Sequence, residues 1–368
     1  MKCAFRPIAP ALNFSLQYEA GYSLTFPADT IHGLSLLLRL RPEAANGKPR
    51  YLASRYALPA GGDSAEEAAL QVRFALSAGA WRVEAVAIDD AGKACRADWR
   101  AEVKRDPAPA TKPSQRVRRL TVLVDSQPIH ITPALYPPSD LAMLTGALAA
   151  VLRVIPADSA RLIVFNLAQQ KELLRNDTFQ PAALPDVVKT IAATQSGTID
   201  YASLQPDLTA RFLAGLVNRE LGEPDCADAV VFLGAASQER YRIPPGLIVP
   251  GASHPPFFYL QLGLLRASDG PRTLGYTPPA GSTFPTPGSR RNCGAPATGG
   301  PCMAGPAPPP SSPPVLTGSA PVDDAISNSV AILGGQTIAV STPKELAKAI
   351  GRIAERSQRS ARSQRGQW

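Results

Sequence analysis

The sequence lacks the residue patterns of several common catalytic and metal sites. None of its five cysteines forms the Cys-x-x-Cys pair of a structural zinc site. It has no P-loop and no Gly-x-Ser-x-Gly, and no Gly-x-Gly-x-x-Gly follows the buried strand expected at 119–126. The usual nucleotide, dinucleotide and serine-hydrolase motifs are therefore excluded.

Histidine is also scarce, with only His32, His130 and His254 in 368 residues. The neighbouring serines give two possible nucleophile and base pairs, Ser126 with His130 and Ser253 with His254. Residues so close in sequence rarely reach the geometry that a nucleophile and its base require. We therefore expect no enzyme. The alternative is a hydrolase-like α/β enzyme with an unrecognised site at the strand ends.

No stretch approaches 18 apolar residues, so no membrane-spanning helix is expected. The N-terminus begins with a basic residue but lacks the apolar run of a signal peptide. Either the protein is cytosolic or its true start lies upstream. Part of the net charge of +8 lies in an arginine-rich tail at 358–368, which we interpret as solvated, and no nucleic-acid partner is expected.

Composition indicates two folded modules interrupted by a low-complexity segment. The 45% hydrophobic content is sufficient to build cores, and the length favours two domains. Residues 267–322 hold 14 of the 38 prolines, among many glycines and serines, which predicts a disordered insertion. Cys293 and Cys302 flank a Gly/Pro loop within it; they either form a local disulfide or remain free thiols.

The N-terminal part alternates apolar and polar residues with a period of two, which is typical of half-buried strands. Such stretches recur about every ten residues, so we predict a β-sandwich-like module at 1–106, followed by a Pro-rich linker at 107–115. The expected strands are 22–26, 34–40, 70–76, 81–88 and 95–103.

The C-terminal part, 116–357, alternates short buried apolar runs with helical patterns. This order predicts an α/β fold of the doubly wound, Rossmann-like type with a mostly parallel sheet. In such sheets ligands bind at the carboxyl ends of the strands. The first strand ends at Asp125 and Ser126, which places that edge of the sheet near these residues.

Three pieces of this part, 120–126, 158–165 and 334–346, occur in an order that resembles a von Willebrand factor type A domain. With the upstream β module, residues 10–357 resemble the VWFA-related domain family expanded in acidobacterial genomes. The resemblance implies binding of a protein partner at the top of the sheet through a divalent ion. It also implies an extracytoplasmic or cell-envelope location.

The metal site implied by the resemblance is degenerate in this sequence. Mg²⁺ and Mn²⁺ need hard oxygen ligands, which the family supplies with Asp-x-Ser-x-Ser after the first strand. Here Asp125 matches, but Gln127 and Ile129 occupy the two later positions. The family's later aspartate is absent after Gly234, and Thr198 is the residue available to replace its threonine. We therefore expect no metal and no cofactor, with Asp125 accepting hydrogen bonds from loop amides.

These observations predict a non-catalytic, metal-independent protein–protein interaction module whose partner is unidentified. We expect the partner at the loop rim above the strand ends. The candidate residues of this rim are Asp125, Ser126, Gln127, His130, Thr198, Gly234 and Ser237.

Overall fold

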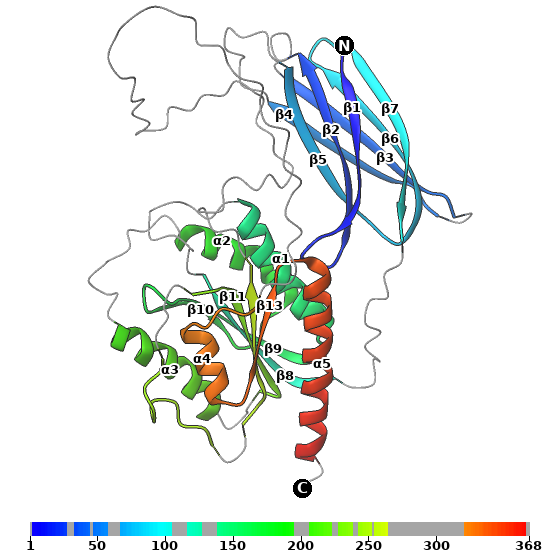
Figure 1. Ribbon diagram of the computed structural model, residues 1–368. Coiled ribbons are helices and arrows are strands. Elements are labelled where there is room, and N and C mark those ends of the chain that lie inside the picture. Colours follow the sequence, from blue (N-terminus) through cyan, green and yellow to red (C-terminus); the bar gives the residue numbers. More distant parts are fainter. Residues whose placement is uncertain are drawn as a thin grey trace, which may run out of the picture.

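The computed structural model describes most of both predicted modules (Figure 1). Nearly all of the predicted insertion and the whole linker 107–115 lie outside the described residues, as do Cys293 and Cys302. The described residues are 2–27, 33–44, 47–57, 67–104, 116–126, 138–194, 206–222, 227–237, 242–251, 254–263 and 320–365.

The N-terminal part forms two antiparallel sheets that face one another across a shared core. The three-stranded sheet has the order β1 (Ala4–Leu12), β2 (Tyr18–Pro27), β5 (Glu67–Leu76). The four-stranded sheet has the order β4 (Arg50–Ala57), β3 (Gly33–Pro42), β6 (Gly79–Asp89), β7 (Ala94–Val103). All five strands expected from alternation are present.

Two of the seven strands, β1 and β4, were not expected from the sequence. β1 contains Pro7 and Pro10, and proline is tolerated in a strand mainly at a sheet edge, which is where β1 lies. β4 was missed for a different reason. Seven of its eight residues are exposed, so its sequence shows no alternation of buried and exposed side chains.

The C-terminal part is built on one mixed six-stranded sheet. Its order is β10 (Lys171–Asn176), β9 (Ala157–Asn166), β8 (Val117–Asp125), β11 (Ala229–Ala235), β12 (Phe257–Leu262), β13 (Gln336–Val340). The strands from β9 to β13 are parallel, and β10 runs antiparallel at the edge.

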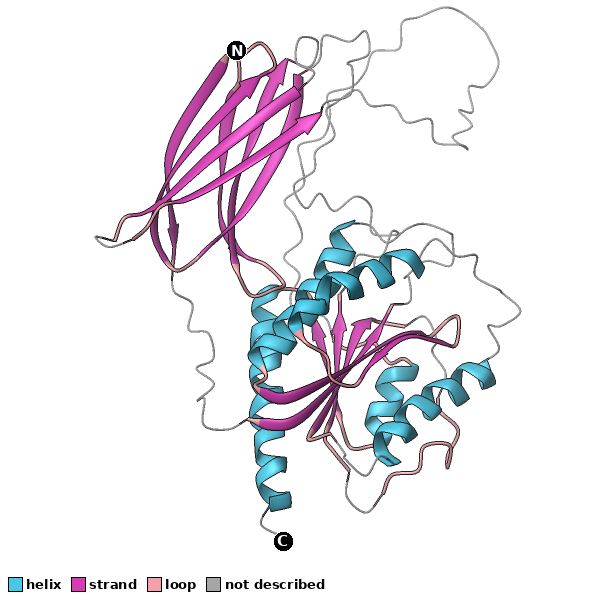
Figure 2. Cartoon of the chain, turned by 180° about the vertical axis from the view of Figure 1, so that it is seen from behind, coloured by secondary structure: helices cyan, strands magenta, loops and turns pink. Residues whose placement is uncertain are grey.

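Helices cover both faces of this sheet (Figure 2). One face packs against α1 (Pro138–Val154), α2 (Leu184–Thr194) and α5 (Pro343–Arg365). The other packs against α3 (Pro206–Gly222) and α4 (Ala325–Ile332). A short 3-10 turn, η1 (Pro181–Ala183), precedes α2. Helix α5 continues to Arg365, so the predicted basic tail is largely helical.

The expected fold class, a doubly wound, mostly parallel Rossmann-type fold, is wrong for this chain. Strand accounts for 46% and helix for 29% of the structure, in two antiparallel sheets and one mixed sheet. The prediction gave too much weight to the strand and helix alternation of the C-terminal part. It undercounted the N-terminal strands, which are 8 to 11 residues long.

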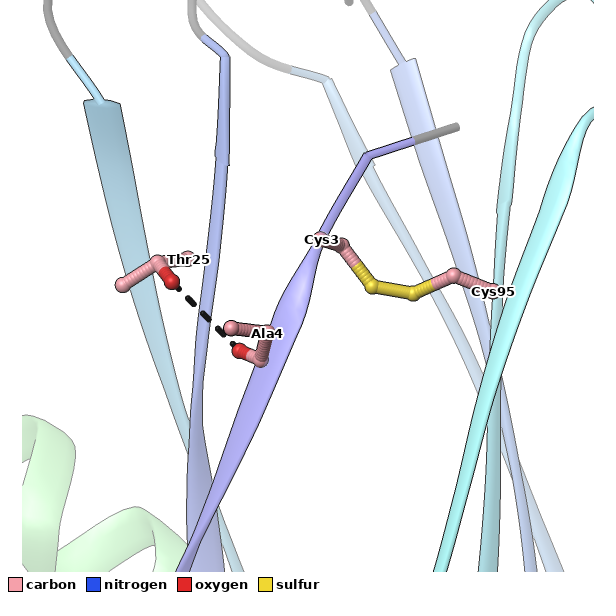
Figure 3. The surroundings of a disulfide bond; sticks show 4 residues. All are labelled: Cys3, Ala4, Thr25 and Cys95. Carbon is pink, nitrogen blue, oxygen red and sulfur yellow. Dashed lines mark hydrogen bonds between the residues drawn. A yellow bond between two sulfur atoms is a disulfide. The ribbon is translucent and has the colours of Figure 1, made fainter.

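A disulfide joins Cys3 to Cys95 across one side of the sandwich, with a Cα–Cα distance of 6.4 Å (Figure 3). Cys3 directly precedes β1, and Cys95 lies in β7, so the bond links the edges of the two sheets. This pairing was not expected from the sequence, because the two cysteines are 92 positions apart.

Candidate functional site

The predicted strand-end residues are held inside the C-terminal sheet. Asp125 ends β8 with only 3% of its surface exposed, and its Oδ1 accepts a hydrogen bond from the Leu167 backbone N–H at 3.3 Å. Ser126 is fully buried and donates from both its backbone N–H and its Oγ to the Phe165 carbonyl, at 2.8 and 2.9 Å. These bonds fix the end of β8 to the end of β9.

On the other side of β8, Gly234 allows β11 to approach Asp125 closely. A Cβ built at Gly234 would lie 3.0 Å from the Cβ of Asp125 and 3.3 Å from its carbonyl oxygen. Real Cβ atoms rarely come so close to their neighbours, so glycine is the residue that fits here. The chain continues from β8 to β9 and β10 on one side and then crosses to β11 on the other side, so the strand order reverses at β8.

A buried carboxylate, Asp324, completes the cluster. It caps the N-terminus of α4 by accepting from the Ser327 N–H at 2.7 Å, with the Ser327 side chain reciprocating in a capping box. It also accepts from the Ser237 N–H at 2.8 Å and from Gln261 Nε2 at 3.1 Å. Burial raises the pKa of Asp324 above its ordinary value, and these hydrogen bonds offset only part of that shift.

Tyr259 lies next to Asp324 and is influenced by the charge of Asp125. Its hydroxyl donates to the Ala235 carbonyl at 2.6 Å and lies 3.3 Å from Asp324 Oδ2. Burial, with the negative charges of Asp324 and Asp125, raises the pKa of Tyr259 well above its ordinary value. Tyr259 is therefore a neutral hydrogen-bond donor at physiological pH.

The structure thus brings four of the predicted residues together at adjacent strand ends, namely Asp125, Ser126, Gly234 and Ser237. All four are buried, and the described contacts of Asp125, Ser126 and Ser237 are internal hydrogen bonds. The other three predicted residues, Gln127, His130 and Thr198, lie outside the described residues. Binding at the loop rim remains a prediction.

Sequence reasoning missed three members of this cluster, namely Tyr259, Gln261 and Asp324. Gln261 is the only polar side chain besides Tyr259 in the buried strand β12, and this isolated polar position was an available signal. The spacing of Asp324 and Ser327 ahead of an apolar helix is a second signal, because it fits an N-terminal cap. Nothing in the sequence links these residues to Asp125, since they come together only through the sheet.

The cluster behaves chemically as a structural network. Within the described ranges, no group of three or more His, Cys, Asp or Glu side chains is placed to hold a metal ion. The one described histidine, His254, contacts the Pro255 carbonyl at 3.0 Å and packs its ring near Phe257. The internal hydrogen bonds hold the ends of β8, β9, β11 and β12 and the start of α4 in fixed positions.

A second site lies on the N-terminal sandwich, at the edge strand β4. Three exposed large hydrophobic side chains gather there: Leu37 at 45%, Tyr51 at 68% and Leu52 at 37% exposure. Arg39 is opposite Tyr51 and Leu37 is opposite Ala53 in the β3–β4 register, which places Leu37 and Tyr51 on the outer face of the sheet. Leu52 is opposite the buried Leu38 and lies on the inner face. We call Leu37 together with Arg50–Ala57 the β4 edge.

The two lateral edges of the sandwich differ in how they are closed. The edge formed by β1 and β7 is linked by the Cys3–Cys95 disulfide. At the other edge, β4 and β5 are joined by a hydrogen bond from Arg50 Nη1 to the Ala75 carbonyl at 3.4 Å. Among the described strands, only β3 pairs with β4, so one backbone side of β4 has no strand partner there.

Comparisons with known proteins give no family for this chain. No family model matches it. No curated protein matches it. Solved structures show only weak similarity, and three of them have TM-scores of 0.18 to 0.20, which is too low to support any argument about fold or function.

The first of these structures is Northeast Structural Genomics Consortium target SoR45, with 14% identity over 28% of this chain and 85% of that one. The sporulation control protein Spo0M from Bacillus subtilis shares 13% identity over 29% of this chain and 51% of its own. A putative β-galactosidase from Bacteroides fragilis shares 10% identity over 71% of this chain and 42% of its own.

The expected von Willebrand factor type A and Rossmann-like character of the chain is not supported. The described structure is predominantly β, and the structural similarities are weak and of low identity. The sequence pieces behind the resemblance do lie in β8, β9 and the region from β13 to α5. Their order reflects an alternation of strands and helices that many α/β sheets share.

Proposed function

We propose that this protein is a non-catalytic binding protein that takes a protein partner at the β4 edge. The observation that carries the proposal is the clustering of exposed apolar side chains on two adjacent strands. Leu37, Tyr51 and Leu52 make up half of the six exposed large hydrophobic residues in the described ranges. Leu37 and Tyr51 are diagonal neighbours on the outer face, and Leu52 is exposed on the inner face of the same edge. Contiguous exposed apolar patches mark interaction sites more often than scattered single residues do.

The geometry of the strand supports the same function. An exposed edge strand offers a row of backbone N–H and C=O groups to an extended partner segment, and neighbouring side chains then provide selectivity. Tyrosine and arginine, both present in β4, are enriched at the energetically important positions of protein interfaces.

The strand-end cluster of the C-terminal sheet supports a structural role for that part. The described polar groups of Asp125, Ser126 and Asp324 are used in bonds that hold strands and a helix cap. We propose that the C-terminal part is a rigid platform that carries the binding sandwich.

The Cys3–Cys95 bond supports an oxidising compartment as the working environment of the protein. Disulfides persist in secreted, periplasmic and cell-surface proteins and are rare in reducing cytosol. We therefore propose that the partner is met outside the cytosol.

Site-specific photocrosslinking in the source cells tests this function. A benzophenone amino acid is placed at Tyr51, and a matched probe at Arg96, which is exposed on β7 at the opposite edge of the same sheet. We expect a discrete protein adduct from position 51 and none from position 96. The adduct should weaken when Leu37→Glu places a charge in the apolar patch.

Two results would contradict the proposal. Equal labelling from both positions would indicate non-specific encounters. The absence of any protein adduct at position 51, with the probe shown to be photoactive and the protein folded, would rule out the β4 edge as a binding surface.

A further inference from the structure

We propose that the partner at the β4 edge is a second copy of this chain, paired through an antiparallel β4–β4 contact centred on Ala53. This inference rests on the proposed binding function and specifies its partner. The pair would join two four-stranded sheets into one continuous eight-stranded sheet across a two-fold axis.

The backbone of β4 favours pairing with another strand. The strand is eight residues long, lies at a sheet edge and has seven exposed residues. Natural proteins usually protect such edges with proline, inward-pointing charges or bulges. The described residues 50–57 contain no proline, and the register with β3 runs without a shift from Leu34–Tyr56 to Leu40–Arg50. Arg50, opposite the buried Leu40, is an inward-pointing charge at one end of the strand and bonds the Ala75 carbonyl of β5, whereas residues 51–57 have no such charge.

The β4 segment Arg-Tyr-Leu-Ala-Ser-Arg-Tyr is self-complementary when two copies pair antiparallel. In an antiparallel pair centred on Ala53, Tyr51 of one copy lies opposite Arg55 of the other. By the same symmetry Arg50 lies opposite Tyr56, and each contact occurs twice. All four arginines of the two strands then face a tyrosine, so no like charges are directly opposite.

In this register the inner and outer faces of the two sheets remain continuous. Residues directly opposite in an antiparallel pair project to the same side of the sheet. Tyr51 and Arg55 both lie on the outer face, because they are opposite Arg39 and Ser35 of β3. Tyr51 is 68% exposed, and the Arg55 side chain is 80% exposed and forms a 4.0 Å ion pair with Asp90.

A slip of the pairing by one residue, which puts the two-fold axis between two residues, is not equivalent. It would place an outward residue of one copy opposite an inward residue of the other, which the pleat forbids for a continuous sheet. A slip by two residues in one direction centres the pair on Leu52 and pairs only residues 50–54. In the other direction it centres the pair on Ser54 and pairs residues 51–57, but Arg55 then lies opposite Ala53 and Tyr51 opposite Ala57. Of these registers, only the one centred on Ala53 places each arginine opposite a tyrosine.

The contact is expected to be concentration-dependent. One edge strand per copy buries less than the roughly 1,600 Å² of a standard stable interface, so association should be reversible. The expected species are a monomer at low concentration and a dimer at high concentration in sedimentation velocity runs on the full chain.

Engineered disulfides test the register directly. Opposite residues of an antiparallel pair have Cα atoms about 4.5–5.5 Å apart, within the range a disulfide accepts. Ala53→Cys should therefore form a covalent dimer under mild oxidation. The matched control is Ser54→Cys, also exposed, whose two copies would be too far apart in this register. Wild type treated in parallel accounts for the native cysteines.

Charge substitutions at one position give a second test. Tyr51→Arg places arginine opposite Arg55 twice and should weaken the dimer about tenfold or more. Tyr51→Glu places a carboxylate opposite Arg55 twice and should preserve or tighten it. If the copies instead met through the apolar outer face, both charged variants would weaken the dimer.

The outcomes separate the two proposals. A chain that stays monomeric at all concentrations, with a position-51 adduct to a different protein, overturns the second-copy inference and leaves the binding function standing. Covalent dimers from Ser54→Cys as readily as from Ala53→Cys overturn the register and with it the inference. A monomer with no adduct at position 51 overturns both proposals.

Discussion

Gly146 of α1 and Ser15 of the β1–β2 hairpin are in direct contact, and this contact connects the sandwich to the C-terminal part. A Cβ built at Gly146 would lie 3.1 Å from both the backbone N and the Oγ of Ser15. Phe14 and Leu16, on either side of Ser15, pack against the apolar core beneath α1 and α5. Arg153 of α1 donates a hydrogen bond to the Ser15 carbonyl.

The first prediction concerns this junction. Gly146→Leu should displace the hairpin and lower stability by about 1–3 kcal/mol, because the added side chain has no room beneath Ser15. The measurement is urea unfolding followed by tryptophan fluorescence. Gly215→Leu in α3 is the matched control, since a Cβ there meets nothing within 4 Å. It should stabilise by up to about 1 kcal/mol through helix propensity. Equal effects of both changes would show that the hairpin contact does not matter.

The second prediction concerns the Cys3–Cys95 disulfide. Its loss should lower the free energy of unfolding by about 2–5 kcal/mol, because it closes a loop with a sequence separation of 92. Denaturant unfolding of wild type with and without reductant measures the effect. The double variant Cys3→Ser with Cys95→Ser should match reduced wild type and should not respond to reductant. A wild-type unfolding curve that reductant does not change would contradict a stabilising Cys3–Cys95 disulfide.

The third prediction concerns the pH dependence that Asp324 contributes. Its folded-state pKa is raised above 3.8, so the folded protein binds the proton more tightly than the unfolded chain does. The resulting stability is present at low pH and is lost as pH rises through the raised pKa. The difference in unfolding free energy between wild type and Asp324→Asn should therefore fall as pH increases from about 3.8. A difference that grows with pH would mean that the hydrogen bonds to the ionised form outweigh its burial.

The fourth prediction compares two buried tyrosines. The hydroxyl of Tyr22 has no hydrogen-bond partner among the described residues, and its ring packs between Phe5 and Trp99, at 5.1 and 5.7 Å. Tyr22→Phe should stabilise the protein by about 1 kcal/mol, because it removes an unsatisfied buried polar group. Tyr259→Phe removes the bond to the Ala235 carbonyl and should destabilise by about 1–3 kcal/mol. Chemical denaturation of both variants measures these changes in stability. A loss of stability in Tyr22→Phe would contradict the inference that the Tyr22 hydroxyl is unsatisfied.

Much of the secondary structure follows from local sequence pattern. The alternation in 81–88 predicted the central strand β6, and the Thr342, Pro343 and Glu345 cap matches the observed start of α5, where Glu345 and Thr342 bond each other's backbone N–H groups. The capping pattern at Asp324 was also readable, although its wider role was not. These features depend on residues within a few positions of one another, so one segment contains all the information.

Strand order, disulfide pairing and the candidate site depend on contacts between distant segments. The sequence by itself determined that the chain is rich in strands before residue 104, that strands and helices alternate after 116, and that Asp125 ends a buried strand. Only the tertiary structure decided that β10 runs antiparallel, that Cys3 meets Cys95 and that β4 lies at the edge of its sheet among the described strands. It also brought Asp324 and Tyr259 to Asp125. The physical reason is that hydrophobic periodicity specifies which face of an element is buried, whereas the partner of that face is selected by packing of the whole chain.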